Sequence, residues 1–164
     1  MPSGVVHPQH GGLVRVTIDN PSYVKADPNL AGDLGIGVPR AIEGWAILDT
    51  GASISCVTVN TAEALALLTV DAVSFTGVRA GHTPASEERE HTRLRYGLLR
   101  IGGVARDFLI RMAEIRELGE HSDLPIVGLL GRDVLSNAEL GWDGLSGAFD
   151  LNFPEPSVAS PPEA

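Results

Sequence analysis

The chain has 164 residues, which is enough for one domain and too few for two sizeable ones. Its net charge of −9 argues against a nucleic-acid partner, which would need a basic face. There is no apolar run of membrane-spanning length and no secretory pattern at the start, so we expect neither a membrane partner nor export. A single cysteine, Cys56, excludes an intrachain disulfide framework and favours a reducing compartment, so we expect a cytoplasmic location.

The composition favours a mainly β protein. Hydrophobic residues make up 43% of the chain, which supports a packed core. The 19 glycines and 11 prolines indicate many turns rather than long helices. Val, Ile and Thr recur in short clusters, as is typical of short strands.

The first quarter of the chain predicts one strand between irregular segments. Residues 1–11 are rich in Pro, Gly and His, and we expect them to form a flexible arm. Apolar and polar residues alternate over 13–19, as in a half-buried strand. Residues 20–40 carry many turn residues, and we expect a long loop with a short strand around 36–38.

An acidic residue interrupts the next apolar segment. The run over 45–48 predicts a buried strand that ends at Asp49, and a second apolar run covers 54–57. An unpaired charge at the inner end of a buried strand would be costly, so Asp49 calls for an explanation. Good helix formers then follow Asn60, which predicts a helix over 60–68 with that residue as its N-cap.

Two hairpins are predicted next along the chain. Residues 69–78 alternate like a strand, and a polar tip leads to a second strand over 92–101. Gly102-Gly103 is typical of a tight hairpin turn, with the returning strand over 104–115.

The last part of the chain predicts a strand, a short helix and a closing hairpin. The apolar segment over 124–135 is interrupted by glycines, and a short helix is expected at 132–137. Residues 136–153 predict a hairpin with Asp143-Gly144 at its turn. Residues 154–164 carry four prolines and no core pattern, so we expect a disordered tail.

Two short motifs resemble those of one protein family. The apolar strand that runs into Asp49-Thr50-Gly51-Ala52-Ser53 is similar to the active-site sequence of aspartic proteases. Leu129-Leu130-Gly131-Arg132-Asp133 resembles the second motif of the retropepsins, the retroviral-type members. The resemblance covers roughly residues 12–153 and is closest to single-domain, bacterial-type members. It implies an all-β, retropepsin-like acid-protease barrel with one clear helix and one short helix, assembled as a two-fold homodimer.

The chemistry of aspartic proteases explains why one Asp-Thr-Gly implies a dimer. Hydrolysis needs two carboxylates that share one proton: the ionised one accepts a proton from water, while the protonated one polarises the scissile carbonyl. This chain contains a single Asp-Thr-Gly. A two-fold axis would bring Asp49 against its counterpart and complete the pair.

The resemblance also assigns roles to the neighbouring residues. Asp49 would activate the water, Thr50 would hydrogen-bond across the dimer axis, and Gly51 would let the substrate backbone approach closely. The remaining site residues fall into three groups: cleft-lining residues (Ile47, Ala52, Ser53, Ile54, Val127, Gly128 and Leu129), flap residues within 76–85 (Thr76, Gly77, Val78, Arg79, Ala80 and Gly81), and residues that support the Asp49 loop from behind (Leu130, Gly131, Arg132 and Asp133). The strand over 147–153 would interleave between the subunits.

Two features depart from the retroviral pattern. Ser53 and Ile54 stand where those enzymes usually carry acidic residues, so Arg132 lacks its family partner at that place. The stretch over 20–40 also makes the first hairpin much longer than in the compact viral enzymes.

The same residues admit other interpretations. Asp49 as a plain turn residue leaves the second motif unexplained, whereas a retained fold without activity accounts for both motifs. Cys56 lies in an apolar strand without a basic neighbour, which favours a buried thiol over a nucleophile. Ser53 lacks the Gly-x-Ser-x-Gly elbow of serine hydrolases, and the five histidines lack metal-ligand spacing and are expected at the surface.

We therefore expect an aspartic endopeptidase that acts on peptide or protein substrates as a homodimer, without metal or cofactor. The alternative is a catalytically inactive dimer of the same fold that binds peptides or serves only to dimerise. A monomeric β scaffold is a third interpretation.

Overall fold

The computed structural model describes residues 4–8, 10–24, 41–75, 90–116, 118 and 123–154. Most of these residues lie in strands, and the helices are few and short, so the prediction of a mainly β protein is confirmed. None of the helices in these segments is long and apolar enough to span a membrane. The predicted strand at 36–38, the flap over 76–85 and the tail beyond residue 154 lie outside the described residues.

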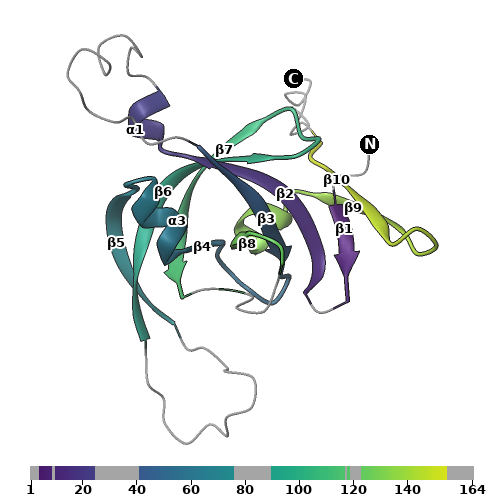
Figure 1. The fold of residues 1–164 in the computed structure, drawn as a ribbon, viewed down its shortest axis with the longest axis horizontal. Helices are drawn as coiled ribbons and strands as arrows, with labels where there is room; N and C mark the ends of the chain where they lie inside the picture. The colour runs from purple at the N-terminus through teal and green to yellow at the C-terminus, as the bar shows by residue number, and fades with distance from the viewer. Residues whose placement is uncertain are drawn as a thin grey trace, which may run out of the picture.

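Six strands close into a barrel (Figure 1). In ring order they are β6 (Glu90–Ile101), β7 (Asp107–Ile115), β4 (Cys56–Thr58), β8 (Ile126–Leu130), β3 (Ile42–Leu48) and β2 (Gly11–Asp19). The ring closes because β6 changes partner along its length. Its first half pairs with β5 (Leu68–Phe75), and its last residues pair with β2.

Beyond the ring, the sheet continues with β5 next to β6 and with three further strands next to β2. β1 (Gly4–His7) pairs with the first residues of β2 and, on its other side, with β10 (Ala148–Asn152); β10 in turn pairs with β9 (Glu139–Asp143). The prediction of a flexible arm over 1–11 is therefore wrong for the residues of β1, because long-range strand pairing orders them. Gly4 is needed there, since an added Cβ would overlap the Phe149 ring.

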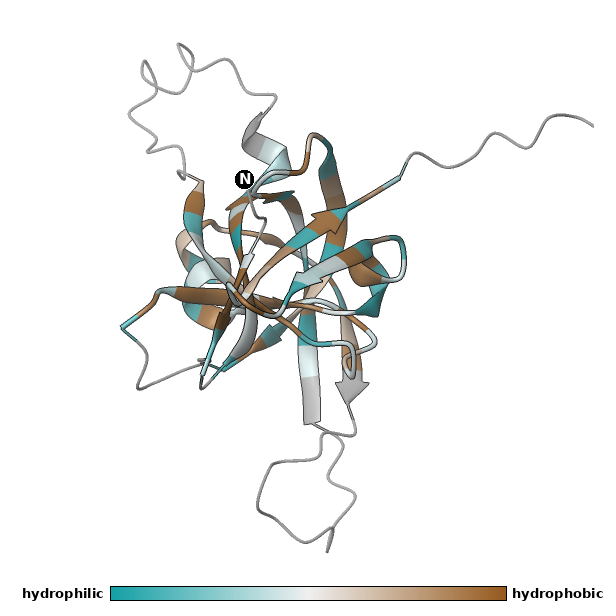
Figure 2. Cartoon of the chain, turned by 90° about the vertical axis from the view of Figure 1, so that its right-hand side faces the viewer, coloured by the Kyte–Doolittle hydropathy of each residue, from teal (hydrophilic) through white to brown (hydrophobic). Residues whose placement is uncertain are grey.

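The core follows from the alternation of side chains along the strands. In β2, Val14, Val16 and Ile18 are buried, while Arg15 is exposed between them. Figure 2 shows the hydrophobic residues running along the strands that enclose the interior. The same core continues under β10, where Phe149 is 1% exposed.

Three short helices connect the described strands: α1 (Pro21–Val24), α3 (Val59–Ala64) and α4 (Arg132–Leu135). The N-cap of α3 is Thr58, not the predicted Asn60, because β4 leads directly into the helix; the Thr58 hydroxyl accepts a hydrogen bond from the Thr61 N–H. The short helix predicted at 132–137 is confirmed as α4, although it is shorter.

Of the three predicted hairpin turns, the two that lie within the described residues are present. Gly103 adopts φ 81°, a left-handed conformation that favours glycine, between β6 and β7. The turn after Asp143 joins β9 to β10, and the Asp143 side chain accepts hydrogen bonds from the Leu145 and Ser146 N–H groups.

Candidate functional site

The two sequence motifs meet at one end of the barrel. The loop that carries Asp49 leaves β3 after Leu48 and enters β4 at Cys56. β8 lies between these two strands, parallel to β3 with Leu48 opposite Leu130, and antiparallel to β4 with Cys56 opposite Leu129. The strand that delivers the second motif therefore contacts both strands that flank the Asp49 loop.

Backbone hydrogen bonds fasten the Asp49 loop to the second motif. The Asp49 N–H donates to the Leu130 carbonyl at 3.0 Å, and the Arg132 N–H donates to the Ala52 carbonyl at 2.9 Å. Gly131 lies between these contacts, and a Cβ added there would come within 2.6 Å of the Ile54 carbonyl carbon. The glycine of the second motif is thus required by the close approach of the two backbones.

A small polar network lies under the loop. Ser55 is fully buried; its hydroxyl donates to Asp133 Oδ1 at 2.7 Å and its N–H donates to Asp133 Oδ2 at 3.0 Å. The Ser55 hydroxyl also accepts the Gly131 N–H at 3.0 Å. Leu130, Gly131 and Asp133 therefore all contact the loop segment from behind, whereas Arg132 contributes its backbone and makes no side-chain ion pair within the part of the chain that the structure describes.

The Asp49 carboxylate is oriented by its own loop. Its Oδ1 accepts hydrogen bonds from the Gly51 N–H at 2.8 Å and the Ala52 N–H at 3.3 Å. Asp49 is half-buried, while Thr50 and Gly51 are exposed, so the charge does not carry the cost of full burial. Among the described residues Oδ2 has no hydrogen-bond donor, which leaves one oxygen of a fixed carboxylate available.

The predicted cleft residues fall into two groups. Ile47, Ala52 and Ile54 are half-buried around the loop, and Ser53 is exposed beside them. Leu129 is half-buried as well. Val127 and Gly128 instead pack inward: Val127 is part of the hydrophobic core, and a Cβ on Gly128 would overlap the Cys56 carbonyl oxygen.

The flap prediction reaches the edge of the described structure. β5 and β6 form an antiparallel ladder as far as Phe75 opposite Glu90. The predicted flap residues from Thr76 to Gly81 lie beyond that pair, outside the described residues.

Cys56 is held in its thiol form. Burial, and to a smaller extent the negative charges of Asp133 and Asp49, together raise the pKa of the Cys56 thiol to about 12. The Sγ atom donates to the Ile54 carbonyl at 3.7 Å. These features agree with a buried thiol and argue against a nucleophile, because the thiolate is the reactive form.

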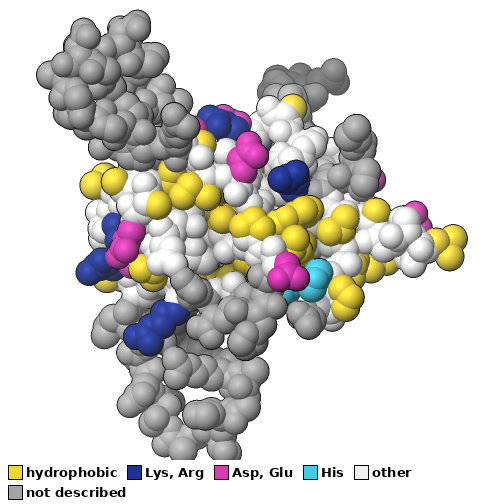
Figure 3. Space-filling model, viewed as in Figure 1, with side chains coloured by type: hydrophobic (Ala, Val, Ile, Leu, Met, Phe, Trp, Pro, Cys, Tyr) yellow, Lys and Arg dark blue, Asp and Glu magenta, His cyan; other side chains and the backbone are white. Residues whose placement is uncertain are grey.

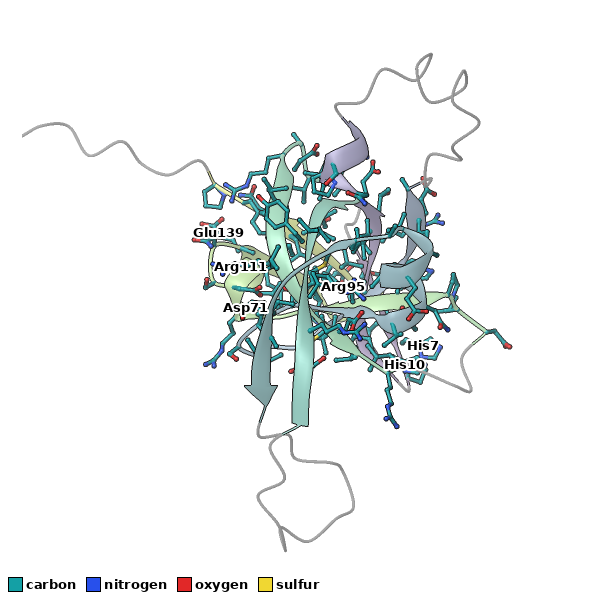
Figure 4. All side chains as sticks on the ribbon, turned by 90° about the vertical axis from the view of Figure 1, so that its left-hand side faces the viewer. His7, His10, Asp71, Arg95, Arg111 and Glu139 are labelled. Carbon is teal, nitrogen blue, oxygen red and sulfur yellow. The ribbon has the colours of Figure 1, made fainter. Side chains whose placement is uncertain are left out.

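Two histidines lie together at the turn between β1 and β2, which sequence analysis did not anticipate. The rings of His7 and His10 stack with their centroids 4.8 Å apart (Figure 4). His10 Nε2 is buried and lacks a hydrogen-bond partner among the described residues, so this histidine is not a solvated surface residue as predicted. The described segments contain no group of three or more His, Cys, Asp or Glu residues that could hold a metal ion.

Ser55 is the supporting residue that sequence analysis missed. Its signal was a hydroxyl within the apolar run over 54–57, where a buried polar group needs partners.

No protein-family model and no curated protein matches the chain. The residues and their geometry alone therefore carry the functional interpretation.

Proposed function

We propose that this protein is an aspartic endopeptidase of the retropepsin type, which hydrolyses peptide bonds as a homodimer without metal or cofactor. The observation that carries the proposal is the seating of β8 between β3 and β4, which joins the Leu129–Asp133 motif to the Asp49 loop by backbone hydrogen bonds. A plain turn aspartate would need no such support from a distant segment.

The proposed chemistry uses one carboxyl group from each subunit. Two carboxylates held close together cannot both ionise, so the pair carries one shared proton. The ionised Asp49 takes a proton from water as the water oxygen attacks the scissile carbonyl carbon, and the protonated Asp49 donates to the carbonyl oxygen. Collapse of the tetrahedral intermediate then breaks the C–N bond, with a proton delivered to the departing amine.

The exposure of Thr50 and Gly51 supports the dimer requirement. A single chain supplies one oriented carboxylate with one available oxygen, and the tip of its loop is open to a partner. An isologous contact at this loop would bring the two Asp49 side chains together across a two-fold axis.

Incubation of the purified protein with an unbiased peptide library, from acidic to neutral pH, tests the proposal. We expect cleavage that Asp49→Asn lowers by at least about 10²–10⁴-fold, the range for loss of a general acid–base group. Asp107→Asn is the matched control, because Asp107 is an exposed carboxylate paired with Arg100 away from the loop. Equal cleavage by wild-type protein and Asp49→Asn would show that Asp49 is not catalytic.

The second candidate is an inactive dimer of the same fold that binds peptides or only dimerises. It is favoured by the hydrogen bonds from Gly51 and Ala52 to Asp49 Oδ1, which by themselves give this carboxylate a local role in the loop. Binding of a statine-type transition-state mimic separates the two candidates, because a competent pair of carboxyl groups recognises the mimic and an incompetent site does not.

A further inference from the structure

The turn between β1 and β2 brings two histidine side chains together. His7 is the last residue of β1, His10 directly precedes β2, and His7 is paired with Gly11 at the start of that strand. The two rings stack with their centroids 4.8 Å apart and with 22° between the ring planes (Figure 4). Both residues are half-buried, and Figure 3 shows histidine surface at one place on the face that it draws, beside an acidic side chain. The pair can therefore be reached from solvent.

The Nε2 atom of His10 distinguishes this pair from simple ring stacking. It is buried, and it has no hydrogen-bond partner among the described residues. Buried polar atoms in native proteins are nearly always paired, and an unpaired one costs free energy. Stacking of the rings accounts for their proximity but gives this nitrogen no partner. A ligand that bonds to the nitrogen itself would supply that partner.

The chemistry of the pair suits a divalent transition-metal ion. Neutral imidazole is the commonest metal ligand in proteins, and it binds Zn²⁺, Ni²⁺ and Cu²⁺ well. With metal–nitrogen bonds of about 2.0–2.1 Å, two imidazoles on one tetrahedral ion hold their ring centroids roughly 5 Å apart. The observed separation of 4.8 Å agrees with this arrangement. Binding then requires the two rings to rotate, while the paired strands stay in place.

We propose that His7 and His10 bind a divalent transition-metal ion of the class of Zn²⁺, Ni²⁺ and Cu²⁺. The described residues offer no third His, Cys, Asp or Glu to the group, so water fills the remaining positions. Binding is therefore weaker than at a structural site with four protein ligands. Mg²⁺ does not compete, because it takes oxygen ligands. The ion has no part in the proposed hydrolysis, and the proposal does not rest on the proposed function.

The proposed metal site lies beside the Asp49 loop. β2 and β3 stay adjacent as far as Leu48, because a Cβ added to Gly12 would lie 3.2 Å from the Leu48 side chain. The adjoining residues of the two strands are Gly11 and Asp49, and Gly11 is the residue paired with His7. An ion on the histidine pair would therefore fasten β1 to β2 at the point where β2 borders the Asp49 loop.

Calorimetric titration of the untagged full chain with ZnCl₂ or NiCl₂ tests the proposal. We expect one ion to bind per chain. The midpoint of thermal unfolding should rise with Zn²⁺ or Ni²⁺ and stay constant with Mg²⁺, because a ligand that binds only the folded state stabilises it. An unchanged midpoint together with no heat of binding would overturn the proposal.

Substitution of each histidine tests the assignment of the ligands. His7→Ala and His10→Ala should each weaken binding at least about tenfold, since loss of a supporting partner alone costs about 10–100-fold in metal affinity. His121→Ala removes a histidine from another part of the sequence and is the matched control, with the affinity of wild type. Equal affinity in wild type and His10→Ala would show that this residue is not a ligand.

An NMR measurement on the wild-type chain avoids any effect of the substitutions on folding. The chain has five histidines, and the ring nitrogen signals of a histidine shift when a metal ion binds to it. We expect Zn²⁺ to shift the signals of His7 and His10 and to leave those of the other three in place. Any other set of shifted signals, or none, would overturn the proposal.

Discussion

The Asp49 loop and the β9–β10 hairpin both reverse the direction of the chain, yet the surrounding structure supports them very differently. The loop is flanked by β8, fastened by two backbone hydrogen bonds and underlain by the buried Ser55 network. The hairpin has β1 on one side only and leaves Leu140, Trp142 and Leu145 exposed. The chain therefore supports its carboxylate from within, while the apolar side chains of the hairpin stay exposed.

The largest effect on the loop is expected from Gly131→Ala. The added Cβ would lie 2.6 Å from the Ile54 carbonyl carbon. Because that atom belongs to the main chain, the overlap can be relieved only if the loop moves. We expect the free energy of unfolding, measured by urea denaturation, to fall by about 3 kcal/mol, as for an overpacked core.

Gly141→Ala is the control for this comparison. Gly141 is in the exposed strand β9, and the nearest atom to its added Cβ is the Asp150 carbonyl oxygen at 4.0 Å. The free energy of unfolding of Gly141→Ala should stay within about 0.5 kcal/mol of the wild-type value. Equal loss in both variants would contradict the difference in support between loop and hairpin.

Ser55→Ala should weaken the loop from below by a smaller amount. Without the hydroxyl, the Gly131 N–H loses its acceptor in a buried setting, and Asp133 loses one donor. A buried unsatisfied donor costs about 1–3 kcal/mol, and we expect the lower half of that range because Asp133 is partly open to water. Ser53→Ala, at an exposed position two residues away, should leave urea denaturation unchanged; a matching loss there would show that the network is not the cause.

The rate at which the Cys56 thiol is labelled reports whether the Asp49 loop stays closed. The pKa of Cys56 is raised to about 12 from an ordinary value of 9.0, so at pH 8 the folded thiol ionises about 10³-fold less than an unfolded one. We expect thiol labelling at pH 8 to be slower by about that factor than in urea. Because the folded pKa is the higher one, stability should fall as pH rises above the ordinary value. Labelling of the native protein at the unfolded rate would mean that the loop and β4 open readily.

The smallest effect is expected at the hairpin turn. Asp143 has its pKa lowered by a hydrogen bond from the Ser146 hydroxyl and then by the Leu145 and Ser146 N–H groups. Ser146→Ala should move the pKa of Asp143 up toward its ordinary value, as followed by the NMR shift of its carboxyl carbon. The lowered pKa stabilises the turn above the unfolded value, and this contribution is lost as pH falls through the folded value. An unmoved pKa would show that the hydroxyl does not hold this turn.

The sequence predicted most strands because alternation along segments such as 13–19 reflects one buried face. It also predicted contact between the Asp49 loop and the 129–133 motif, because the two motifs resemble those of one family. The strand β1 was missed because four residues containing Gly and His carry no periodic signal, and its order comes from pairing with β2 and β10.

Other features of the structure could not be predicted from local sequence patterns. Closure of the barrel depends on β6 changing partners, which no alternation within that strand encodes. Val127 was assigned to the cleft from its position near the motif, yet its side chain belongs to the core. Leu140 and Trp142 are residue types that usually lie in a core. They are exposed because no other part of the described structure covers this face of β9.

We propose that Asp49 is half of a catalytic pair that a second copy of the chain completes. The most direct test of this proposal is to titrate a fixed amount of wild-type protein with Asp49→Asn while measuring peptide cleavage. Mixed dimers hold one carboxylate and one amide, so at a ninefold excess of the variant the activity per wild-type chain should fall to about one tenth. Activity per wild-type chain that stays constant throughout the titration would contradict the shared site.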